Sequence, residues 1–253
     1  MSRDVEMAKQ TPFFSIITVS LNSGLDLIRT VESVLNQTYH NFEIVIQDAK
    51  STDQSLEKLP IDNRIHLYIE QDQGIYDGMN KAVSHVTGDY CMFLNCGDEL
   101  YDSNTLQFLA NRVQEFPCYD IYYGDIYKEG RRICQLYNVT EFQLYRSTIC
   151  HQALLYRADI FKTAVYDISF RFCADYEHLV RMWFENRDFK KIDAIVVKYQ
   201  GGGLSEKSVN QIAMKEEYAT IRGRYFNKMV KLKYNLYQLF TLRLFYHKLF
   251  TRK

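Results

Sequence analysis

Apolar residues follow two different spacings along the N-terminal part of this chain. Continuous apolar runs, which are typical of buried parallel strands, cover residues 13–20, 42–47, 65–69 and 90–94. Between these runs, apolar residues recur at helical spacing over 25–35 and 75–86, and a short helix is expected to end at Leu59. Gly88 is expected to cap the helix before the fourth strand. This alternation predicts an α/β fold in which helices cover both faces of a mostly parallel sheet.

Beyond residue 100 the spacing is less regular but still interpretable. It predicts a helix over 106–116, a hairpin over 119–135 turning at Glu129-Gly130, a strand over 152–156, a helix over 176–185 and a strand over 192–199. Neither an internal repeat nor a low-complexity linker divides the sequence. We therefore predict one mixed α/β domain over residues 1–217, followed by a helical tail over 218–253.

The composition is that of a globular protein rich in aromatic residues. Of 253 residues, 47% are hydrophobic and 25% are charged, with 20 Tyr and 16 Phe. The six cysteines stand singly, without the paired spacing of zinc ligands. The N-terminus does not read as a signal peptide, so we expect reduced thiols in a cytoplasmic protein.

The C-terminal tail carries an unbalanced charge although the formal net charge of the chain is +0. Residues 218–253 contain nine Lys or Arg, nine aromatic residues and no Asp or Glu. Polar residues interrupt the apolar ones, so the tail is not expected to span a membrane. A basic aromatic helix suits an anionic membrane surface. A helix pair in a homodimer is the main alternative, and nucleic acid, which a basic aromatic face can also bind, is not expected as a partner.

Polar residues follow each of the first four predicted strands where it ends. They are Thr18 and Asn22 at the first, Asp48, Ser51 and Asp53 at the second, Asp72 and Gly74 at the third, and Asn95 and Asp98 at the fourth. The carboxyl ends of parallel strands meet at one edge of a sheet, where such folds bind ligands. This convergence predicts a nucleotide site, although Asn22, Asp48 and Asp53 could each be turn formers. The sequence has neither a dinucleotide fingerprint nor a P-loop.

Five stretches resemble the inverting, GT-A-fold glycosyltransferases of family 2, in particular a bacterial branch that builds capsule, O-antigen and exopolysaccharide repeat units. They are "SIITVSLNSG", "VESVLNQTYHNFEIVIQDAKSTD", "DQGIYDGMNKAVSHVTGDYCMFLNCGDEL", "HQALLY" and "RFCADYEHLVRMW". The resemblance covers residues 13–205 and is most specific over 72–98. It implies a GT-A (Rossmann-like) fold whose nucleotide-binding part is 13–100 and whose acceptor part is 101–205.

Carried over residue by residue, the resemblance implies a binding site for a nucleotide-sugar donor, with a UDP-sugar in first place. Thr18, Asn22 and Asp48 would line the base and ribose, Ser51 and Asp53 would hold that loop, and Asp72 and Gly74 would flank the donor. Asp77, Asn80 and Lys81 share one helix face, which would point to the sugar-diphosphate or to the loop over it. Lys81 could instead be a solvated helix charge.

Two positions depart from the pattern of the family and leave the choice of base open. Lys50 stands where the family has a glycine that allows a free turn. Leu21 stands where an aromatic residue often precedes Asn22. Stacking of the base is therefore expected to be weaker or to come from another residue.

The stretch Asn95-Cys96-Gly97-Asp98 stands where the family has its metal-binding aspartates. Mg²⁺ or Mn²⁺ needs hard oxygen ligands, and one carboxylate, Asp98, could suffice if a diphosphate and water supply the others. Asn95 could add a neutral carbonyl oxygen, whereas a Cys96 thiolate would suit a softer metal. The alternative is that Asp98 caps a turn without any metal.

Inverting transfer needs a base for the acceptor hydroxyl and positive charge for the leaving diphosphate. The resemblance assigns the base to Asp175, which could also act as an N-cap of the helix that follows. Glu177 is the second choice. His151 is expected near the acceptor or the diphosphate, or in a structural role. Ser205, after three glycines, could close over the diphosphate or belong to a hinge.

Together these features predict a metal-dependent inverting hexosyltransferase. It would move a sugar from a nucleotide-diphosphate-sugar to a hydroxyl of a lipid-linked glycan, in surface polysaccharide biosynthesis at the inner face of the plasma membrane. The reduced metal motif motivates one alternative, a catalytically silent nucleotide-binding or scaffold protein of the same fold. A nucleotidyltransferase is not expected, because "LNSGLDLIR" lacks the glycine-rich loop with Arg and Lys.

Overall fold

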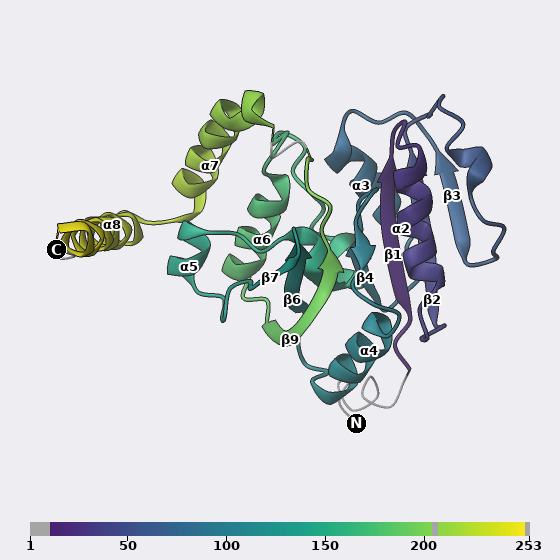
Figure 1. The fold of residues 1–253 in the computed structure, drawn as a ribbon, viewed down its shortest axis with the longest axis horizontal. Coiled ribbons are helices and arrows are strands. Elements are labelled where there is room, and N and C mark those ends of the chain that lie inside the picture. Colours follow the sequence, from purple (N-terminus) through teal and green to yellow (C-terminus); the bar gives the residue numbers. More distant parts are fainter. Residues whose placement is uncertain (1–10, 204–206, 251–253) are drawn as a thin grey trace.

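The computed structural model of the protein describes residues 11–203 and 207–250, with side chains as far as residue 241. Its strands form one mixed sheet in the order β3-β2-β1-β4-β8-β6-β9-β5, with β7 beside β6 (Figure 1). The bounds are Phe14–Ser20 (β1), Phe42–Asp48 (β2), Ile65–Ile69 (β3), Tyr90–Phe93 (β4), Glu99–Leu100 (β5), Ile121–Lys128 (β6), Arg131–Ile133 (β7), Leu154–Arg157 (β8) and Phe189–Lys198 (β9). β1 to β4 pair in parallel, and the antiparallel β8 joins them to β6.

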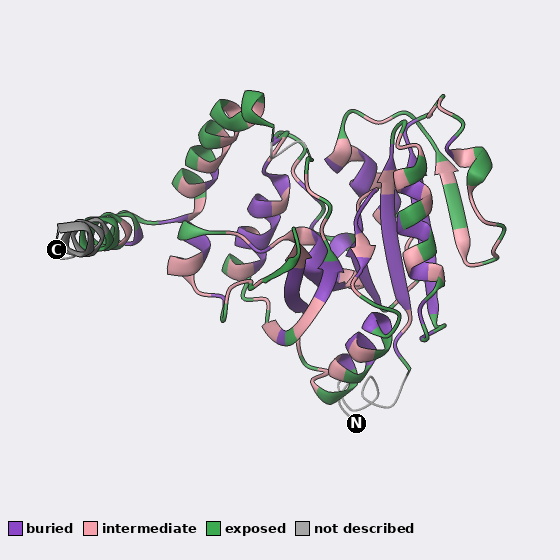
Figure 2. Ribbon diagram, viewed as in Figure 1, coloured by how far each residue is buried: buried purple, intermediate pink, exposed green. Residues whose placement is uncertain are grey.

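Helices cover both faces of this sheet, as the sequence predicts, whereas α8 extends away from it (Figure 1). They are α2 (Leu25–Leu35), α3 (Ile75–Val83), α4 (Thr105–Glu115), α5 (Glu141–Arg146), α6 (Ala174–Phe184), α7 (Gln211–Tyr225) and α8 (Lys228–Phe250). Short 3₁₀ turns cover Leu56–Lys58, His151–Ala153, Ala158–Lys162 and Ser208–Asn210. Buried residues concentrate in the central strands, whereas α7 and the described part of α8 are largely exposed (Figure 2).

The alternation of side chains along β1 divides the core into two layers. Ile16 belongs to the layer that contains Leu27 of α2 and Leu106 of α4. Ile17, on the opposite face, belongs to the layer that contains Met79 of α3 together with residues of α6. These side chains are at most 1% exposed, and each such burial stabilises the fold by roughly 1.5–3 kcal/mol. The apolar run of β1 therefore reflects burial on both faces.

The strand register aligns the carboxyl ends of β1, β2 and β3 side by side. Ser20 at the end of β1 lies opposite Asp48 of β2, which in turn lies opposite Ile69 of β3. The chain continues past β4 with the backbone N–H of Leu94 bonded to the carbonyl of Ile17. The loops that follow these strands consequently leave from one edge of the sheet, as expected for a parallel sheet that binds a ligand there.

The prediction that Gly88 caps α3 is wrong. The helix ends at Val83, and Gly88 instead donates its backbone N–H to Oγ of Ser15 at 2.9 Å. A Cβ atom at Gly88 would lie 2.7 Å from the carbonyl oxygen of Phe13. Glycine is required here because the chain passes close to β1, and this tertiary reason leaves no local signal in the sequence.

The predicted boundary between residues 217 and 218 falls inside α7, so the tail contains the end of one helix and the whole of another. α8 contacts α5 through aromatic pairs, with ring centres 5.8 Å apart for Phe142 and Tyr237 and 5.1 Å apart for Tyr145 and Tyr234. Within the described ranges, every helix is too short or too polar to cross a membrane. The hairpin turn is confirmed, since Glu129 and Gly130 both adopt positive φ between β6 and β7.

Candidate active site

A cavity of about 390 Å³ opens beside the end of β4. Four predicted site residues line it together: Asn95, Asp98, His151 and Asp175. They come from three separate parts of the chain, because the loop after β4, the 3₁₀ turn before β8 and the first turn of α6 meet here. Aromatic side chains form much of the remaining wall, namely Tyr76, Phe172, Tyr199 and Tyr218.

Hydrogen bonds connect three of these residues and Tyr76 in a chain. Nδ2 of Asn95 lies 3.1 Å from Nε2 of His151, and Nδ1 of His151 lies 3.2 Å from Oδ2 of Asp175. An amide nitrogen can only donate, so Nε2 accepts and Nδ1 carries the proton that His151 donates to Asp175. The Tyr76 hydroxyl donates to Oδ1 of Asp175 at 2.8 Å. Both oxygens of the carboxylate are thereby oriented.

The pKa of Asp175 is lower than that of an ordinary aspartate. Burial raises it, but the hydrogen bonds from His151 and Tyr76 outweigh that effect. The side chain keeps 21% of its surface exposed, so a proton donor can reach it. At neutral pH this carboxylate is ionised and can accept a proton. The alternative base, Glu177, is only 1% exposed and accepts a hydrogen bond from the hydroxyl of Tyr225.

The N-terminus of α6 is capped by a distant residue. Oε1 of Glu217 accepts a hydrogen bond from the backbone N–H of Arg171 at 2.9 Å, and Oε2 accepts from Phe172 at 3.0 Å and from Cys173 at 2.9 Å. Cys173 is the N-cap residue of α6 and the other two donors lie in the turn before it, so the negative charge of Glu217 lies at the favourable end of the helix dipole. Glu217 on α7 thus holds the turn that leads into Asp175. Sequence reasoning missed it, because a cap more than 40 positions away has no local signature.

Asp98 is 4% exposed and firmly held. Its Oδ2 accepts from Nε2 of Gln152 at 2.9 Å, and its Oδ1 accepts from the backbone N–H of Gln200 at 2.8 Å. Gly97, at φ +95°, precedes it, and a Cβ there would lie 1.7 Å from Oε1 of Gln200. The loop after β4 therefore depends on glycine at this position.

The loop after β4 fits a hard cation that receives other ligands from a bound diphosphate. Among the described residues there is no group of three His, Cys, Asp or Glu side chains that could hold a metal by themselves. Oδ1 of Asn95 is buried and makes no hydrogen bond within that part of the chain, which leaves it available as an oxygen ligand beside Asp98. The Cys96 thiol donates to the carbonyl of Val19 at 3.3 Å, and burial raises its pKa to about 11. Its reactive thiolate form is therefore disfavoured.

The predicted base and ribose residues form a second network, across the loops after β1 and β2. Asp48 is fully buried and accepts from Ser51 through the backbone N–H at 2.7 Å and the hydroxyl at 2.5 Å. Oγ of Ser51 also accepts from the backbone N–H of Asn22 at 2.8 Å, and Asp53 accepts from that of Gly24 at 2.8 Å. The structure places these residues as turn formers that fix the two loops together. Their contact with a base stays a prediction.

Lys50, the departure noted in the sequence, sits at the tip of this network with φ +66°. A left-handed backbone costs a non-glycine residue roughly 1–2 kcal/mol. Lys50 therefore keeps the left-handed turn that a glycine would adopt easily at this position, and the hydrogen bonds around it stabilise that turn. Thr18 is fully buried beneath the loop, and its hydroxyl donates to the carbonyl of Leu94 at 2.9 Å.

The residues predicted around the donor organise the start of α3. Asp72 accepts from the backbone N–H of Gly74 at 3.0 Å, and Asp77 accepts from that of Gln73 at 2.9 Å. Burial is the main cause of a raised pKa at Asp72. Nζ of Lys81 donates to Oε1 of Glu70 at 2.5 Å and to the carbonyl of Gln71 at 2.6 Å. Lys81 thus contacts the loop before the helix, and its predicted place near the sugar-diphosphate stays a prediction.

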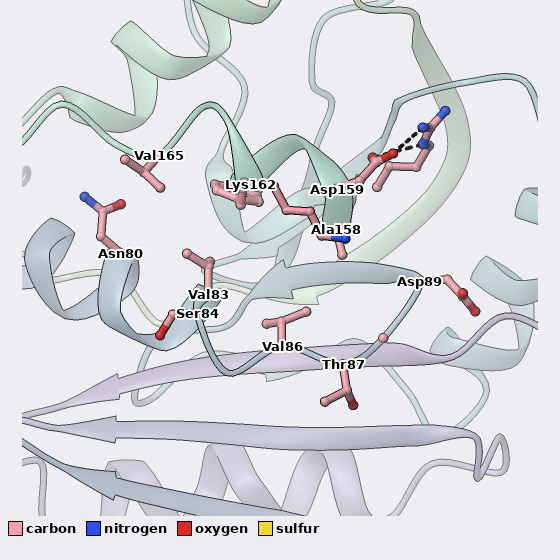
Figure 3. Close-up of a pocket in the computed structure, with 13 residues that line it drawn as sticks. Asn80, Val83, Ser84, Val86, Thr87, Asp89, Ala158, Asp159, Lys162 and Val165 are labelled. Carbon is pink, nitrogen blue, oxygen red and sulfur yellow. Dashed lines mark hydrogen bonds and ion pairs between the residues drawn. The ribbon is translucent and has the colours of Figure 1, made fainter.

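Asn80 lies in a different cavity, of about 640 Å³, at the opposite end of β4. Figure 3 shows it on α3, facing the segment that carries Val165. Its Nδ2 donates to the carbonyl of Tyr166 at 2.8 Å, and its Oδ1 accepts from the N–H of the same residue at 2.9 Å. Asn80 therefore braces α3 against this segment. Ser205 lies outside the described residues.

Comparison with known sequences identifies the class to which this fold and site belong. Residues 15–173 match the family described as "Glycosyl transferase family 2". A PGL/p-HBAD biosynthesis glycosyltransferase of Mycobacterium tuberculosis is 33% identical over 215 residues, which cover 81% of this chain and 83% of the relative. A putative teichuronic acid biosynthesis glycosyltransferase, TuaG of Bacillus subtilis, is 38% identical over 119 residues, covering 44% and 46% of the two chains.

Solved structures show the same architecture. S. aureus TarS 1–349 in complex with UDP-GlcNAc superposes with a TM-score of 0.67 at 18% identity, covering 85% of this chain and 68% of that one. The mannosyltransferase PcManGT from Pyrobaculum calidifontis, in complex with GDP-Man and Mn²⁺, superposes with a TM-score of 0.61 at 15% identity. The match covers 83% of this chain and 62% of that one. At these identities the likeness concerns the fold alone. The expected GT-A fold is confirmed, and the chain belongs to glycosyltransferase family 2.

Proposed function

We propose that this glycosyltransferase moves a sugar, with inversion, from a nucleotide-diphosphate-sugar to a hydroxyl of a lipid-linked glycan. The observation that carries the proposal is Asp175, an ionised carboxylate oriented by His151 and Tyr76 in the cavity that also contains Asp98. A base and a candidate cation ligand in one cavity are what a displacement at an anomeric carbon requires.

In the proposed reaction Asp175 accepts the proton of the acceptor hydroxyl while that oxygen bonds to the anomeric carbon. The bond from this carbon to the diphosphate breaks on the opposite face, which inverts the configuration. His151 holds the carboxylate through its Nδ1–H. Asp98 and Asn95 would hold Mg²⁺ or Mn²⁺, which supplies positive charge to the leaving diphosphate when bound.

The comparisons support a nucleotide-sugar donor and a divalent ion, since TarS was solved with UDP-GlcNAc and PcManGT with GDP-Man and Mn²⁺. We place a UDP-sugar first. The names of the relatives refer to PGL/p-HBAD and teichuronic acid biosynthesis, which supports an acceptor in glycolipid or surface polysaccharide biosynthesis. The loops fixed by Asn22, Ser51 and Asp53 are proposed to bind the nucleotide.

We assign α8 to an anionic membrane surface at the cytoplasmic face of the plasma membrane. One face of the helix packs on α5, and a second face exposes Met229, Leu232, Leu236 and Phe240 at spacings of three or four residues. Lysines flank this exposed stripe, and the segment 218–253 contains no carboxylate side chain. Two such helices pressed together in a homodimer would repel one another, whereas acidic lipid headgroups would attract them.

The proposed function is tested with purified protein, Mn²⁺ and a panel of UDP-, GDP- and dTDP-sugars. We expect hydrolysis or transfer with one donor, and loss of turnover in Asp175→Asn with donor affinity kept within a few-fold, because the carboxylate acts on the acceptor. Calorimetry measures the affinity. Tight nucleotide binding without turnover of any donor would overturn the proposal in favour of a catalytically silent nucleotide-binding protein.

A further inference from the structure

A leaving diphosphate needs positive charge, and the side chains expected to supply it are engaged elsewhere. Lys81, the cation predicted from the sequence, is bound to Glu70 and Gln71. His151 lies between Asn95 and Asp175 with both ring nitrogens in hydrogen bonds. A further cation of the chain is therefore required if the protein itself is to neutralise the diphosphate.

Arg171 is the one Lys or Arg among the described residues that line the active-site cavity. Its side chain is exposed and forms no ion pair with a carboxylate of the described ranges. Other arginines near this half of the molecule are paired, for example Arg157 with Asp159 and Arg224 with Asp167. The charge of Arg171 is thus available to a ligand.

The position of Arg171 is fixed by the turn on which it stands. Its backbone N–H donates to Oε1 of Glu217 at 2.9 Å, and the next two N–H groups bind the same carboxylate. The guanidinium carbon lies 5.4 Å from the ring centre of Phe172, which also lines the cavity. Asp175 follows four positions later. The turn that carries the base therefore also carries a cation, and Glu217 holds both.

We propose that the guanidinium of Arg171 binds the diphosphate of the nucleotide-sugar and stabilises it as the leaving group, an inference that rests on the proposed function. A guanidinium presents parallel N–H donors that match two phosphate oxygens. Such a contact complements a cation at Asp98, because the loop after β4 offers only one carboxylate to hold that cation.

The inference is tested by calorimetry with the full chain, Mn²⁺, and the diphosphates UDP, GDP and dTDP beside their monophosphates. In Arg171→Gln we expect the Kd of the bound diphosphate to rise about 10- to 100-fold while that of the matching monophosphate stays within about threefold. The Kd of the diphosphate for Arg171→Lys should lie between those of the wild type and Arg171→Gln, since lysine keeps the charge but lacks the paired N–H donors of the guanidinium. Arg146→Gln is the matched control, because Arg146 also lies over aromatic rings but on α5.

Three outcomes would count against the inference. A diphosphate Kd in Arg171→Gln equal to that of the wild type would overturn it and leave the proposed function standing. Equal losses for diphosphate and monophosphate would overturn it as well, since the substitution would then act on the whole nucleotide site. If the wild-type protein binds none of the three diphosphates, the proposed function itself fails. Thermal unfolding of each variant shows whether it is folded.

Discussion

The Tyr76 hydroxyl donates to Oδ1 of Asp175 at 2.8 Å and thereby joins α3 to α6 across the active-site cavity. Tyr76 stands two positions after Gly74, in the first turn of the helix that follows the proposed donor loop. It is 7% exposed, so its ring is held by packing and its hydroxyl has one orientation toward the base. A shift of the loop before α3 would therefore reach the carboxylate of Asp175 directly.

Tyr76→Phe is expected to lower turnover about 10-fold, because one oriented hydrogen bond to a charged group is lost. The KM for the donor should change little. Since that bond favours the ionised form, its loss raises the pKa of Asp175 and moves the acid limb of the pH–rate profile to higher pH. A profile that keeps its acid limb while only KM changes would show that Tyr76 does not act through Asp175.

Asp98→Asn is expected to remove the effect of Mn²⁺ on nucleotide affinity. Calorimetry with the bound diphosphate nucleotide, in Mn²⁺ and in EDTA, should show enhancement by the ion in the wild type and equal affinities in the variant. The amide can no longer accept from both Gln152 and Gln200, so the measurement is made well below the unfolding temperature. Cys96→Ser is the control and should keep the enhancement. An Asp98→Asn protein that retains it would exclude Asp98 as a ligand.

The order of strands and helices in the first half was predictable because each element carries its own signal. Buried parallel strands are apolar throughout, as in β1 and β2, and α2 and α3 show helical spacing between polar loops. The exceptions have tertiary causes. Gly88 is needed for close approach to Ser15, not for a cap, and the turn before α6 is held by Glu217 from another helix.

The candidate site was partly predictable for a similar reason. Asn95, Asp98, His151 and Asp175 stand in motifs, and the structure brings them to one cavity. Contacts between distant elements left no such trace in the sequence. Three such contacts come from the hydroxyl of Tyr76, the amide of Gln152 and the carboxylate of Glu217, each of which binds a residue far away along the chain. The type of these residues alone does not mark them as part of the site.

His178 makes the stability of the fold dependent on pH. It is fully buried, its Nε2 lies 2.8 Å from the carbonyl of Ala164, and burial lowers its pKa to about 3. Below a pH of about 6.5 this histidine binds a proton in the unfolded chain but not in the folded chain. The free energy of unfolding therefore falls as the pH drops from 6.5 toward 3. Between pH 7 and 5.5 the loss should be about 1.2 kcal/mol.

This loss is measured by urea unfolding at the two pH values. His178→Gln should be less stable at neutral pH but should lose about 1.2 kcal/mol less on acidification than the wild type. The exposed His40, changed to Gln, is the control and should reproduce the wild-type loss. A His178→Gln protein with an unchanged pH dependence would show that other groups cause it.

The exposed stripe on α8 predicts binding to acidic vesicles. Leu236 and Phe240 are 54% and 70% exposed, so replacing both with Glu should leave the fold intact while opposing insertion among anionic headgroups. The wild type should sediment with phosphatidylserine vesicles and not with phosphatidylcholine vesicles, and the double variant with neither. Ile61→Glu, at an exposed apolar residue elsewhere, is the control.

Light scattering on the same proteins tests the competing homodimer. A wild-type dimer that the double variant converts to monomer, together with no sedimentation of the wild type with acidic vesicles, would assign the stripe to a helix pair. A monomer in both proteins, with vesicle binding lost only in the variant, is the expected result.

The cap from Glu217 determines where this chain could be exchanged with that of another family member. A junction at residues 217 and 218 would keep the carboxylate but replace the rest of α7, including Ile221, which is fully buried. The helix that positions Glu217 against the turn before Asp175 would then pack through side chains of the other family member. A junction at 226 and 227, between α7 and α8, keeps that turn intact and exchanges only α8. Chimeras built at this point would replace α8 without disturbing the turn that carries Asp175.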